Sequence, residues 1–548
     1  MATQLYFSRD TKVYIEFNNK VWEVPVLDGF SFSQGNNTSE ITLNEMESSG
    51  GISRRGRRAF NDSLAPGEWS LSTYVRPFAS AGAGDGAADD SAHVHAVEEV
   101  LWGMMAGADT YNATTFDFEN STIIPATSIV VGETYEIVTT GTPATNWTGI
   151  GSAASPAAGM VFTANSTVPT GAGTVKRKVT AHDASSNKIS FHASNSSTLG
   201  TANIYFILGD ANRTVMKLTQ AVVNEASIDF EIDGISTISW SGQCSEVLDF
   251  SGSSIVQNTS EVSKTVQVNG TVNSGATTIN LDAGHGAAKG DLLFGTGLPA
   301  TGAPITAVAT NAMTVAATTA QIADDASLTL RKPTLDGTAV QVGDVWLDQD
   351  NSHKLYVFTG TAGAYVPVSE GVTAYPTQEA ITDTSNFIRN RLTTLTVDGT
   401  NTAGLLNAGY DLTLTGGNVS VSNNVTFITP EEIGLVNVPI GHVTGTRSVT
   451  GSFTCYLSVN SAARDGTGDK SRDLFEDLRA LTTVVTNNVG MTFSIGGASG
   501  KRLEISCPTA HLEIPTHSIE DVISLETSFQ ALPATIDSTN EVTFTYKV

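Results

Sequence analysis

The chain has 548 residues, with 55 Asp and Glu against 29 Lys and Arg, which gives a formal net charge of −26. This acidic balance excludes nucleic-acid binding by broad phosphate neutralisation, which needs a basic excess, and 40% hydrophobic residues exclude a disordered chain. Only 15% of the residues are charged and 51 are glycine, a profile typical of a β-rich, turn-rich protein with room for three or four domains.

Most segments predict β-strands, because β-branched or aromatic residues alternate with polar ones between Gly, Asn, Asp and Ser. The clearest are 12–17, 69–75, 411–415, 452–459 and 542–548. Two segments have a helical period: one from about Asp90 to Ala106, and one that starts at Ser471 as N-cap and places Leu474, Leu478 and Leu481 on one stripe. No segment predicts a secretory signal or a membrane span.

The presence of one predicted helix in each half of a β-rich chain favours an internal duplication. Phe30–Ser33 resembles Val419–Ser422, and Phe206–Gly209 resembles Phe493–Gly496. Further matched segments are 69–74 with 453–456, 218–221 with 506–510, and 235–243 with 523–530. The shared order of strand, loop, strand, helix and three strands predicts the same fold twice.

Three segments of different texture separate or interrupt the two halves, and we expect them to be insertions that project outward. Two are rich in Gly, Ala and Thr, and the third contains a predicted hairpin with an acidic turn. The predicted divisions are 1–124 (first domain, N-terminal part), 125–178 (inserted β module), 179–257 (first domain, C-terminal part), 258–332 (inserted β domain), 333–372 (hairpin module) and 373–548 (second domain).

Signals of catalysis or metal binding are poor, and we expect no catalytic site, metal or cofactor. His93 and His95 are two apart on a predicted helix, where they point to different faces, so they are interpreted as surface residues rather than ligands. His511 and His517 lack companions with zinc spacing. Asp348–Ser352 starts like a calcium loop but departs from it at the glycine position, which favours an acidic turn.

Two charge patterns are more informative. In Ser227–Asp233 apolar and acidic residues alternate, which places the carboxylates on one strand face. The ordinary interpretation is a solvated outer face; the functional one is a surface that repels polyanions. The acidic residues assigned to this surface here and in two similar stretches are Asp117, Glu119, Asp229, Glu231, Asp233, Glu504 and Glu513.

The second pattern is the only dense basic cluster of the chain, Arg54, Arg55, Arg57 and Arg58, in a long loop after a predicted strand. In so acidic a chain it complements the acidic surface of another copy. Contact with nucleic acid is the alternative.

The C-terminal portion, Asn418–Leu457 with Val-Ser-Asn-Asn-Val-Thr-Phe-Ile-Thr-Pro-Glu-Glu and then Pro439–Arg447, resembles the major tail tube proteins of tailed bacteriophages. The Gly/Thr-rich blocks resemble modules of phage structural proteins. The resemblance implies a mainly β fold of two tandem sandwich or barrel domains, each with one flanking helix, plus small inserted β domains. It also implies that loops reach the neighbouring ring, which maps inter-ring contacts to the arginine cluster and to Glu431, Glu432 and Arg447.

The same resemblance implies a structural virion protein rather than an enzyme, assembled in the bacterial host cytoplasm. Its partners are further copies of itself, other tail proteins at the tube ends, and genomic DNA that passes through an acidic lumen without specific binding. A duplicated chain implies trimeric rings with pseudo-sixfold symmetry; a single domain implies hexameric rings.

The alternative is a β-rich phage fibre, adhesin or decoration protein. Trp346, Tyr356, Phe358 and Tyr365 in the third insertion would then bind host glycans by stacking on sugars, although the hairpin's own small core explains them as well.

Overall fold

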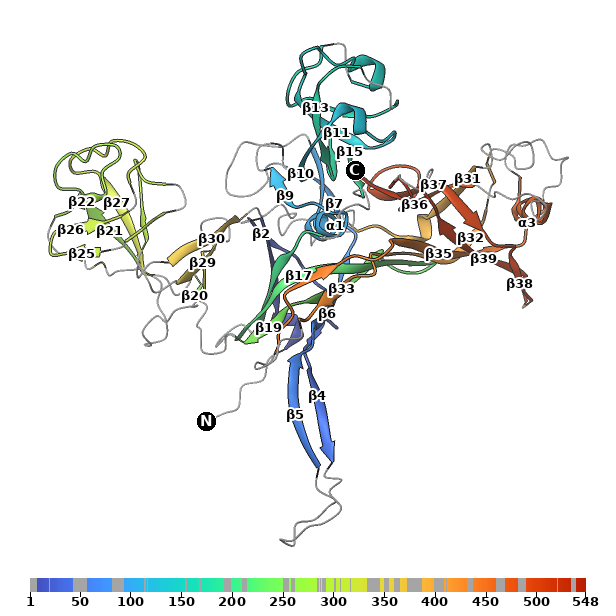
Figure 1. The fold of residues 1–548 in the computed structure, drawn as a ribbon, viewed down its shortest axis with the longest axis horizontal. Helices are drawn as coiled ribbons and strands as arrows, with labels where there is room; N and C mark the ends of the chain where they lie inside the picture. The colour runs from blue at the N-terminus through green and yellow to red at the C-terminus, as the bar shows by residue number, and fades with distance from the viewer. Residues whose placement is uncertain are drawn as a thin grey trace, which may run out of the picture.

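The computed structural model describes residues 7–18, 20–42, 57–80, 93–112, 115, 117–152, 155–166, 170–191, 199–208, 214–249, 256–257, 262–282, 285, 287, 292–299, 302–305, 307–315, 317–332, 345–348, 354–358, 365–371, 387–398, 409–410, 412–430, 437–459, 469–480, 489–519, 521–533 and 539–548. The expectation of a mainly β protein is confirmed (Figure 1). Across these ranges the α-helices are α1 (Glu99–Met105) and α3 (Ser471–Ala480), and neither is long and apolar enough to cross a membrane.

Six antiparallel strands of the first half form one part of a large sheet. In spatial order they are β1 (Lys12–Phe17), β16 (Ala202–Leu208), β17 (Thr214–Glu231), β18 (Thr237–Cys244), β6 (Gly67–Tyr74) and β3 (Ser31–Ser33). Six strands of the second half follow the same spatial and sequence order: β31 (Thr394–Asp398), β36 (Val489–Ile495), β37 (Arg502–Leu512), β39 (Ser524–Ala531), β35 (Ser448–Tyr456) and β32 (Leu414–Ser422).

The two sets of strands also share their irregularities. The register of β16 against β17 shifts between Ala202 and Ile204, and that of β36 against β37 shifts between Val489 and Met491. On this basis Phe206 and Phe493 are equivalent, as the sequence predicts.

The predicted match of Phe30–Ser33 with Val419–Ser422 is shifted by two residues. Ser33 lies opposite Glu68, and its counterpart, which lies opposite Thr450, is Ser420. Side chains of a strand repeat every two residues, so the apolar alternation alone does not distinguish registers two apart.

The two halves join by main-chain pairing. Residues Glu225–Glu231 of β17 pair with β32 on the side opposite to β18. One apolar core runs beneath both halves: Trp102 packs edge-to-face on Trp240 with ring centroids 4.7 Å apart, and Phe230 of the first half lies 5.5 Å from Phe493 of the second.

Further strands extend this sheet. They are β2 (Lys20–Glu23), β14 (Thr180–His182), β15 (Ser186–Ser190), β19 (Glu246–Asp249), β38 (Thr516–Ser518) and β40 (Thr543–Lys547), with β20 (Val256–Gln257) and the hairpin β28 (Val345–Asp348), β29 (Lys354–Phe358) and β30 (Tyr365–Gly371). The three cysteines, Cys244, Cys455 and Cys507, are buried and free.

The predicted helix from Asp90 is wrong at its start. His93–Ala96 forms strand β8, which pairs with β7 (Pro77–Ser80), and the helix begins only at Glu99. Apolar residues at 94, 97, 101 and 104 satisfy a helical period, yet pairing with β7 satisfies the backbone of the first turn instead. Every residue of α1 is buried. In α3, Leu474 and Leu478 are buried as predicted.

Two of the predicted insertions contain sheets and cores of their own. The first sheet comprises β9 (Thr110–Asn112), β10 (Asp117–Pro125), β11 (Thr134–Thr139), β12 (Val161–Thr163) and β13 (Thr174–Lys178) around a core that includes Trp147, so it begins ahead of residue 125. The second unit has two sheets over one core. One sheet contains β21 (Val262–Gln267), β23 (Leu292–Phe294), β24 (Ala303–Pro304) and β27 (Ser327–Lys332). The other contains β22 (Thr278–Asn280), β25 (Ala307–Ala309) and β26 (Ala312–Thr314).

A hairpin occupies the same place in each half. The hairpin of β4 (Asn36–Thr42) and β5 (Arg57–Leu64) lies between β3 and β6 in the sequence, and that of β33 (Thr426–Ile428) and β34 (Gly441–Val443) lies between β32 and β35. Figure 1 shows β4 and β5 projecting well away from the sheet.

Candidate functional site

The candidate site is the solvent face of the joined sheet. On β17, Ile228 and Phe230 are buried, whereas Asp229 and Glu231 are exposed. The predicted alternation is therefore confirmed for these four residues. Ile232, which was expected on the buried side, is 39% exposed because the strand ends at Glu231.

The ladder registers extend this face across eight strands. Ser227 lies opposite Ser239 of β18 and Ser420 of β32. Facing residues of paired strands place their side chains on the same side of the sheet, so this face continues over β6, β3, β35, β39 and the β37–β38 edge. Its residues in the described part are mostly Ser, Thr, Asn and Gln, and none is Lys or Arg. The carboxylates on it are Glu68, Glu225, Asp229, Glu231, Glu513 and Glu526.

Neighbouring hydroxyls and carboxylates interact along this face. Burial and the negative charge of Glu231 together raise the pKa of Asp229. Ser420 Oγ donates a hydrogen bond of 3.0 Å to Glu225 Oε1, and the hydroxyls of Ser31 and Ser70 are 2.8 Å apart. The described part of this face is therefore polar and negative, with no Lys or Arg on it.

Two further predicted carboxylates have cationic partners. Asp233 follows the end of β17, is exposed, and lies 3.9 Å from Arg391. Glu504 accepts from Arg502 Nε at 2.8 Å and pairs with Lys547 Nζ at 2.6 Å. Partial burial opposes ionisation of Glu504, yet the hydrogen bonds from Lys547 and Arg502 lower its pKa.

The placement of Asp117 and Glu119 on an exposed acidic face is wrong. Both are buried, with 5% and 3% of their surface exposed. Lys178 Nζ donates to Asp117 Oδ2 at 2.8 Å and also bonds Glu119, and Lys176 lies 2.7 Å from Glu119. Strand β13, which pairs with β10 in the same sheet, supplies the lysines, a cross-strand contact that the local alternation does not reveal.

Only part of the predicted inter-ring set lies where expected. Arg57 and Arg58 are exposed on β5 of the projecting hairpin, and Arg57 lies 3.1 Å from Glu40. Arg54, Arg55, Glu431 and Glu432 lie outside the described residues. Arg447 is wrong as an inter-ring contact, because its side chain is largely buried, 2.9 Å from Glu541 and over the ring of Phe191.

The aromatic residues of the alternative function lie on the expected hairpin. Trp346 is on β28, Tyr356 and Phe358 are on β29, and Tyr365 starts β30. Their side chains lie outside the described part of the structure, so glycan stacking stays a prediction.

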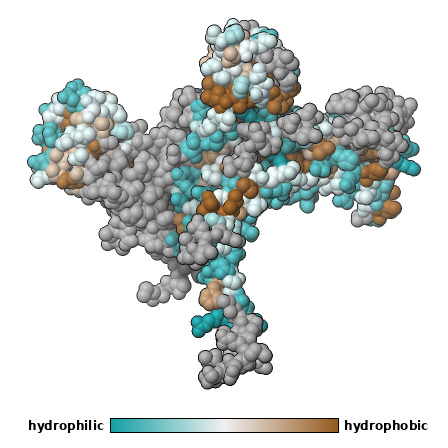
Figure 2. Space-filling view, viewed as in Figure 1, coloured by the Kyte–Doolittle hydropathy of each residue, from teal (hydrophilic) through white to brown (hydrophobic). Residues whose placement is uncertain are grey.

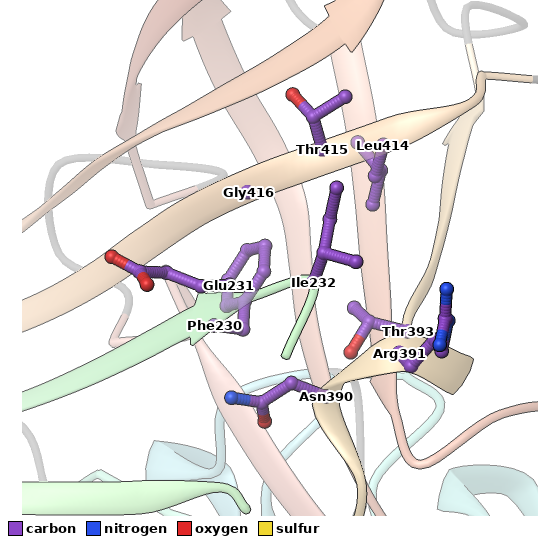
Figure 3. Close-up of a pocket in the computed structure, with 9 residues that line it drawn as sticks. All are labelled: Phe230, Glu231, Ile232, Asn390, Arg391, Thr393, Leu414, Thr415 and Gly416. Atoms are coloured by element: carbon purple, nitrogen blue, oxygen red, sulfur yellow. The ribbon is translucent and has the colours of Figure 1, made fainter. Parts of the chain in front are cut away.

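The junction between the two halves is drawn in Figure 3. Phe230 and Glu231 at the end of β17, with the following Ile232, face the 3₁₀ turn η6 (Asn390–Leu392) and the first residues of β32, Leu414–Gly416. Ser236 N donates to Ile388 O at 2.9 Å and Asn390 N donates to Gly234 O at 3.2 Å, and a side chain at position 417 would collide with the Phe230 ring. The joint is thus built from main-chain bonds and a close apolar fit.

No protein-family model matches the chain. The chain is similar to the tail tube protein pb6 of Escherichia phage T5. The two are 28% identical over 216 residues, which cover 38% of this chain and 44% of that protein. The chain thus spans less than half the length of this relative. The similarity supports homology to a phage tail tube protein.

Sequence reasoning missed three carboxylates of the face, Glu68, Glu225 and Glu526. Each lies two residues from a serine of its own strand that points the same way. A search for Ser and Thr alternating with buried residues would have found them, whereas a search for runs of acidic residues did not.

Proposed function

We propose that this chain is a structural subunit of a bacteriophage tail tube, a virion protein that polymerises and carries out no catalysis. The similarity to a tail tube protein and the mainly β fold support this function. The observation that carries it is the junction of the two halves, because that joint can be repeated between chains.

The proposal includes an internal duplication. The same strand order, the same bulge between the fourth and fifth strands in sequence, and a hairpin and a helix at the same places in both halves support it. Short features agree as well: η1 (Ser8–Asp10) precedes β1 as η6 precedes β31, and Arg9 and Thr11 correspond to Arg391 and Thr393.

Repeating the joint predicts how one chain binds the next. In the chain, β32 pairs with the end of β17. Among the described strands, the equivalent of β32 is β3, whose only ladder partner is β6, and the equivalent of the β17 end is the segment Glu513–Ser518 beside β39. Ser420 opposite Ser227 therefore predicts Ser33 of one copy opposite Thr516 of its neighbour.

Pro515 removes one main-chain donor from this pairing. Leu532 N donates to Thr509 O and Glu513 N donates to Ser528 O, so the even-numbered residues of β39 face β37 and β38. Thr516, opposite Glu526, therefore faces β39, and the main-chain groups of Pro515 and His517 face the open edge. The pairing with a neighbouring chain would lack the one hydrogen bond that a donor at position 515 would make, and the carbonyl of Pro515 and the donor of His517 remain for it.

The open edge also carries an apolar residue that lacks a cover. Phe230, at the end of β17, is 2% exposed because the second half covers it, whereas the equivalent Ile519 is 79% exposed. Figure 2 shows apolar side chains at this end of the molecule, where Figure 1 labels β38. A neighbouring chain would bury Ile519 and close the sheet edges, which removes exposed backbone groups.

Three chains joined in this way present six sheets around a ring, and we propose that the acidic face lines its bore. Double-stranded DNA carries one charge per roughly 1.7 Å of its axis, so a cationic lining would bind it and slow its passage. A lining of hydroxyls and carboxylates keeps DNA in hydrated space. DNA then passes toward the host without specific binding.

Contacts between stacked rings are proposed at the projecting hairpin. The exposed Arg57 and Arg58 on β5 are cations in a subunit of net charge −26, and the hairpin extends beyond the sheet (Figure 1). Acidic surface on the next ring is the complementary partner. Other tail proteins would bind where the stack ends.

A designed disulfide tests the ring. Facing residues of antiparallel strands have Cα atoms about 4.5–5.5 Å apart, which suits a disulfide, and the native cysteines are buried. The variant Ser33→Cys/Thr516→Cys is expected to give a covalent ladder that ends at three chains. The matched control, Ser33→Cys/Ser528→Cys, places the second thiol one strand further away and should not cross-link.

Negative-stain images of the same preparation test the function. Hollow rings or tubes of even width with three cross-linked chains per ring support the proposal. A ladder that continues to six chains would overturn the trimeric ring, and the absence of cross-linking would overturn the joint. Monomers or slender trimers with glycan affinity would favour the adhesin alternative.

A further inference from the structure

Away from the acidic face, histidine and carboxylate side chains converge at the base of the first inserted sheet. His95 is on β8, Glu99 is the first residue of α1, and His182 ends β14. Val94 N donates to Asp183 O at 2.9 Å, which fixes β8 beside the end of β14. In the folded chain β8 and β14 therefore bring together residues that are 87 positions apart in the sequence (182 − 95).

The sequence-based interpretation of His93 and His95 is wrong here. On a strand, residues two apart share a face, and the imidazoles of both contact His182, with ring centroids 4.8 Å and 4.5 Å away. The side chains of His95, Glu99 and His182 are only 2%, 6% and 3% exposed. Two buried imidazoles in contact with a half-buried third are not explained by an ordinary surface role.

We propose that His95, Glu99 and His182 form a binding site for a divalent transition metal, with Zn²⁺ the best match. One ligand atom from each lies within 4.8 Å of the others, and two imidazoles with one carboxylate form a common zinc set. His95 Nδ1 is 3.0 Å from Glu99 Oε2, close to the ~3.3 Å edge of a tetrahedral zinc site.

The surroundings favour a cation. Glu99 Oε1 is buried and has no hydrogen-bond partner among the residues that the structure describes. His182 Nδ1 lies 2.8 Å from Asp117 Oδ1, the arrangement by which carboxylates orient metal-binding histidines. The connected cluster holds four carboxylates (Asp117, Glu119, Glu136 and Glu99) and two ammonium groups (Lys176 and Lys178), a formal charge of 2 − 4 = −2 with neutral imidazoles. One divalent ion balances this charge.

The site would be structural. It joins β8 and α1, which pack into the main core, to β14, which follows directly on the inserted sheet. A metal there would fix the base of the inserted sheet against the tube domain, since a metal ion that binds only the folded state stabilises it.

The test uses the full-length chain, stripped with a chelator and titrated with Zn²⁺ alone by calorimetry. One Zn²⁺ per chain and a higher Tm with Zn²⁺ are expected. His182→Gln should abolish stoichiometric binding, and Asp117→Asn should weaken it about 10- to 100-fold. His511→Gln, an exposed histidine on the acidic face, is the matched control and should bind like the native chain.

Absence of stoichiometric Zn²⁺ binding, or equal binding by His182→Gln, overturns the proposal. If His182→Gln does not fold, the Co²⁺ derivative of the native chain decides. Visible absorption of a tetrahedral site with imidazole ligands supports the site, and an octahedral aqueous spectrum refutes it.

Discussion

Replacing Ile519 by serine tests the repeated joint most directly. The equivalent Phe230 is 2% exposed inside the chain, whereas Ile519 is 79% exposed in the single subunit. Burying an isoleucine side chain contributes about 1.5–3 kcal/mol, so Ile519→Ser should weaken each contact between chains by about 2 kcal/mol, or about 30-fold. A closed ring has three such contacts, and the losses add to about 6 kcal/mol because the sites are distant from each other.

The single subunit should be nearly unaffected, since the side chain is exposed before assembly and surface substitutions change stability by about 0.5 kcal/mol or less. Mass photometry over a concentration series measures the fraction of rings, and thermal unfolding measures the subunit. Ile123→Ser on β10, where Ile123 is 57% exposed, is the matched control and should assemble like the native chain. Rings of Ile519→Ser that form at native concentrations would refute the equivalence of Ile519 and Phe230.

Three further predictions concern charge. Asp229→Lys/Glu231→Lys should leave tube assembly intact but slow genome delivery, with salt-dependent DNA binding by isolated tubes; unchanged delivery would place this face outside the bore. Burial raises the pKa of Glu98 to about 7 from 4.5, so the folded state holds this proton more tightly than the unfolded one, and stability should fall by about 3 kcal/mol as the pH rises from 4.5 to 7. Denaturant titrations at several pH values check this, and Glu98→Gln should remove that part of the slope. Arg57→Glu/Arg58→Glu should leave single rings intact and prevent their stacking in negative-stain images, so native-length tubes would contradict the hairpin contact.

Local patterns were sufficient wherever one strand face meets the core and the other meets water. The alternation around Asp229 predicted which side chains are buried, and the match of Phe206 with Phe493 located equivalent strands in both halves. The same reasoning failed for Asp117, because the side that alternation assigns to solvent is buried, with Lys178 and His182 against the carboxylate. A local pattern distinguishes two faces of a strand but does not reveal what lies against each of them.

The amino-acid sequence alone determined the β-rich character, the acidic balance and the repeated order of predicted strands, since these follow from composition and from a side-chain period of two. Only the tertiary structure decided that β32 pairs with β17, that His182 meets His95, and that Arg447 is enclosed beside Glu541. Each of these contacts joins segments far apart in the chain. Such contacts depend on register and packing between strands, and the alternation within one strand carries no information about either.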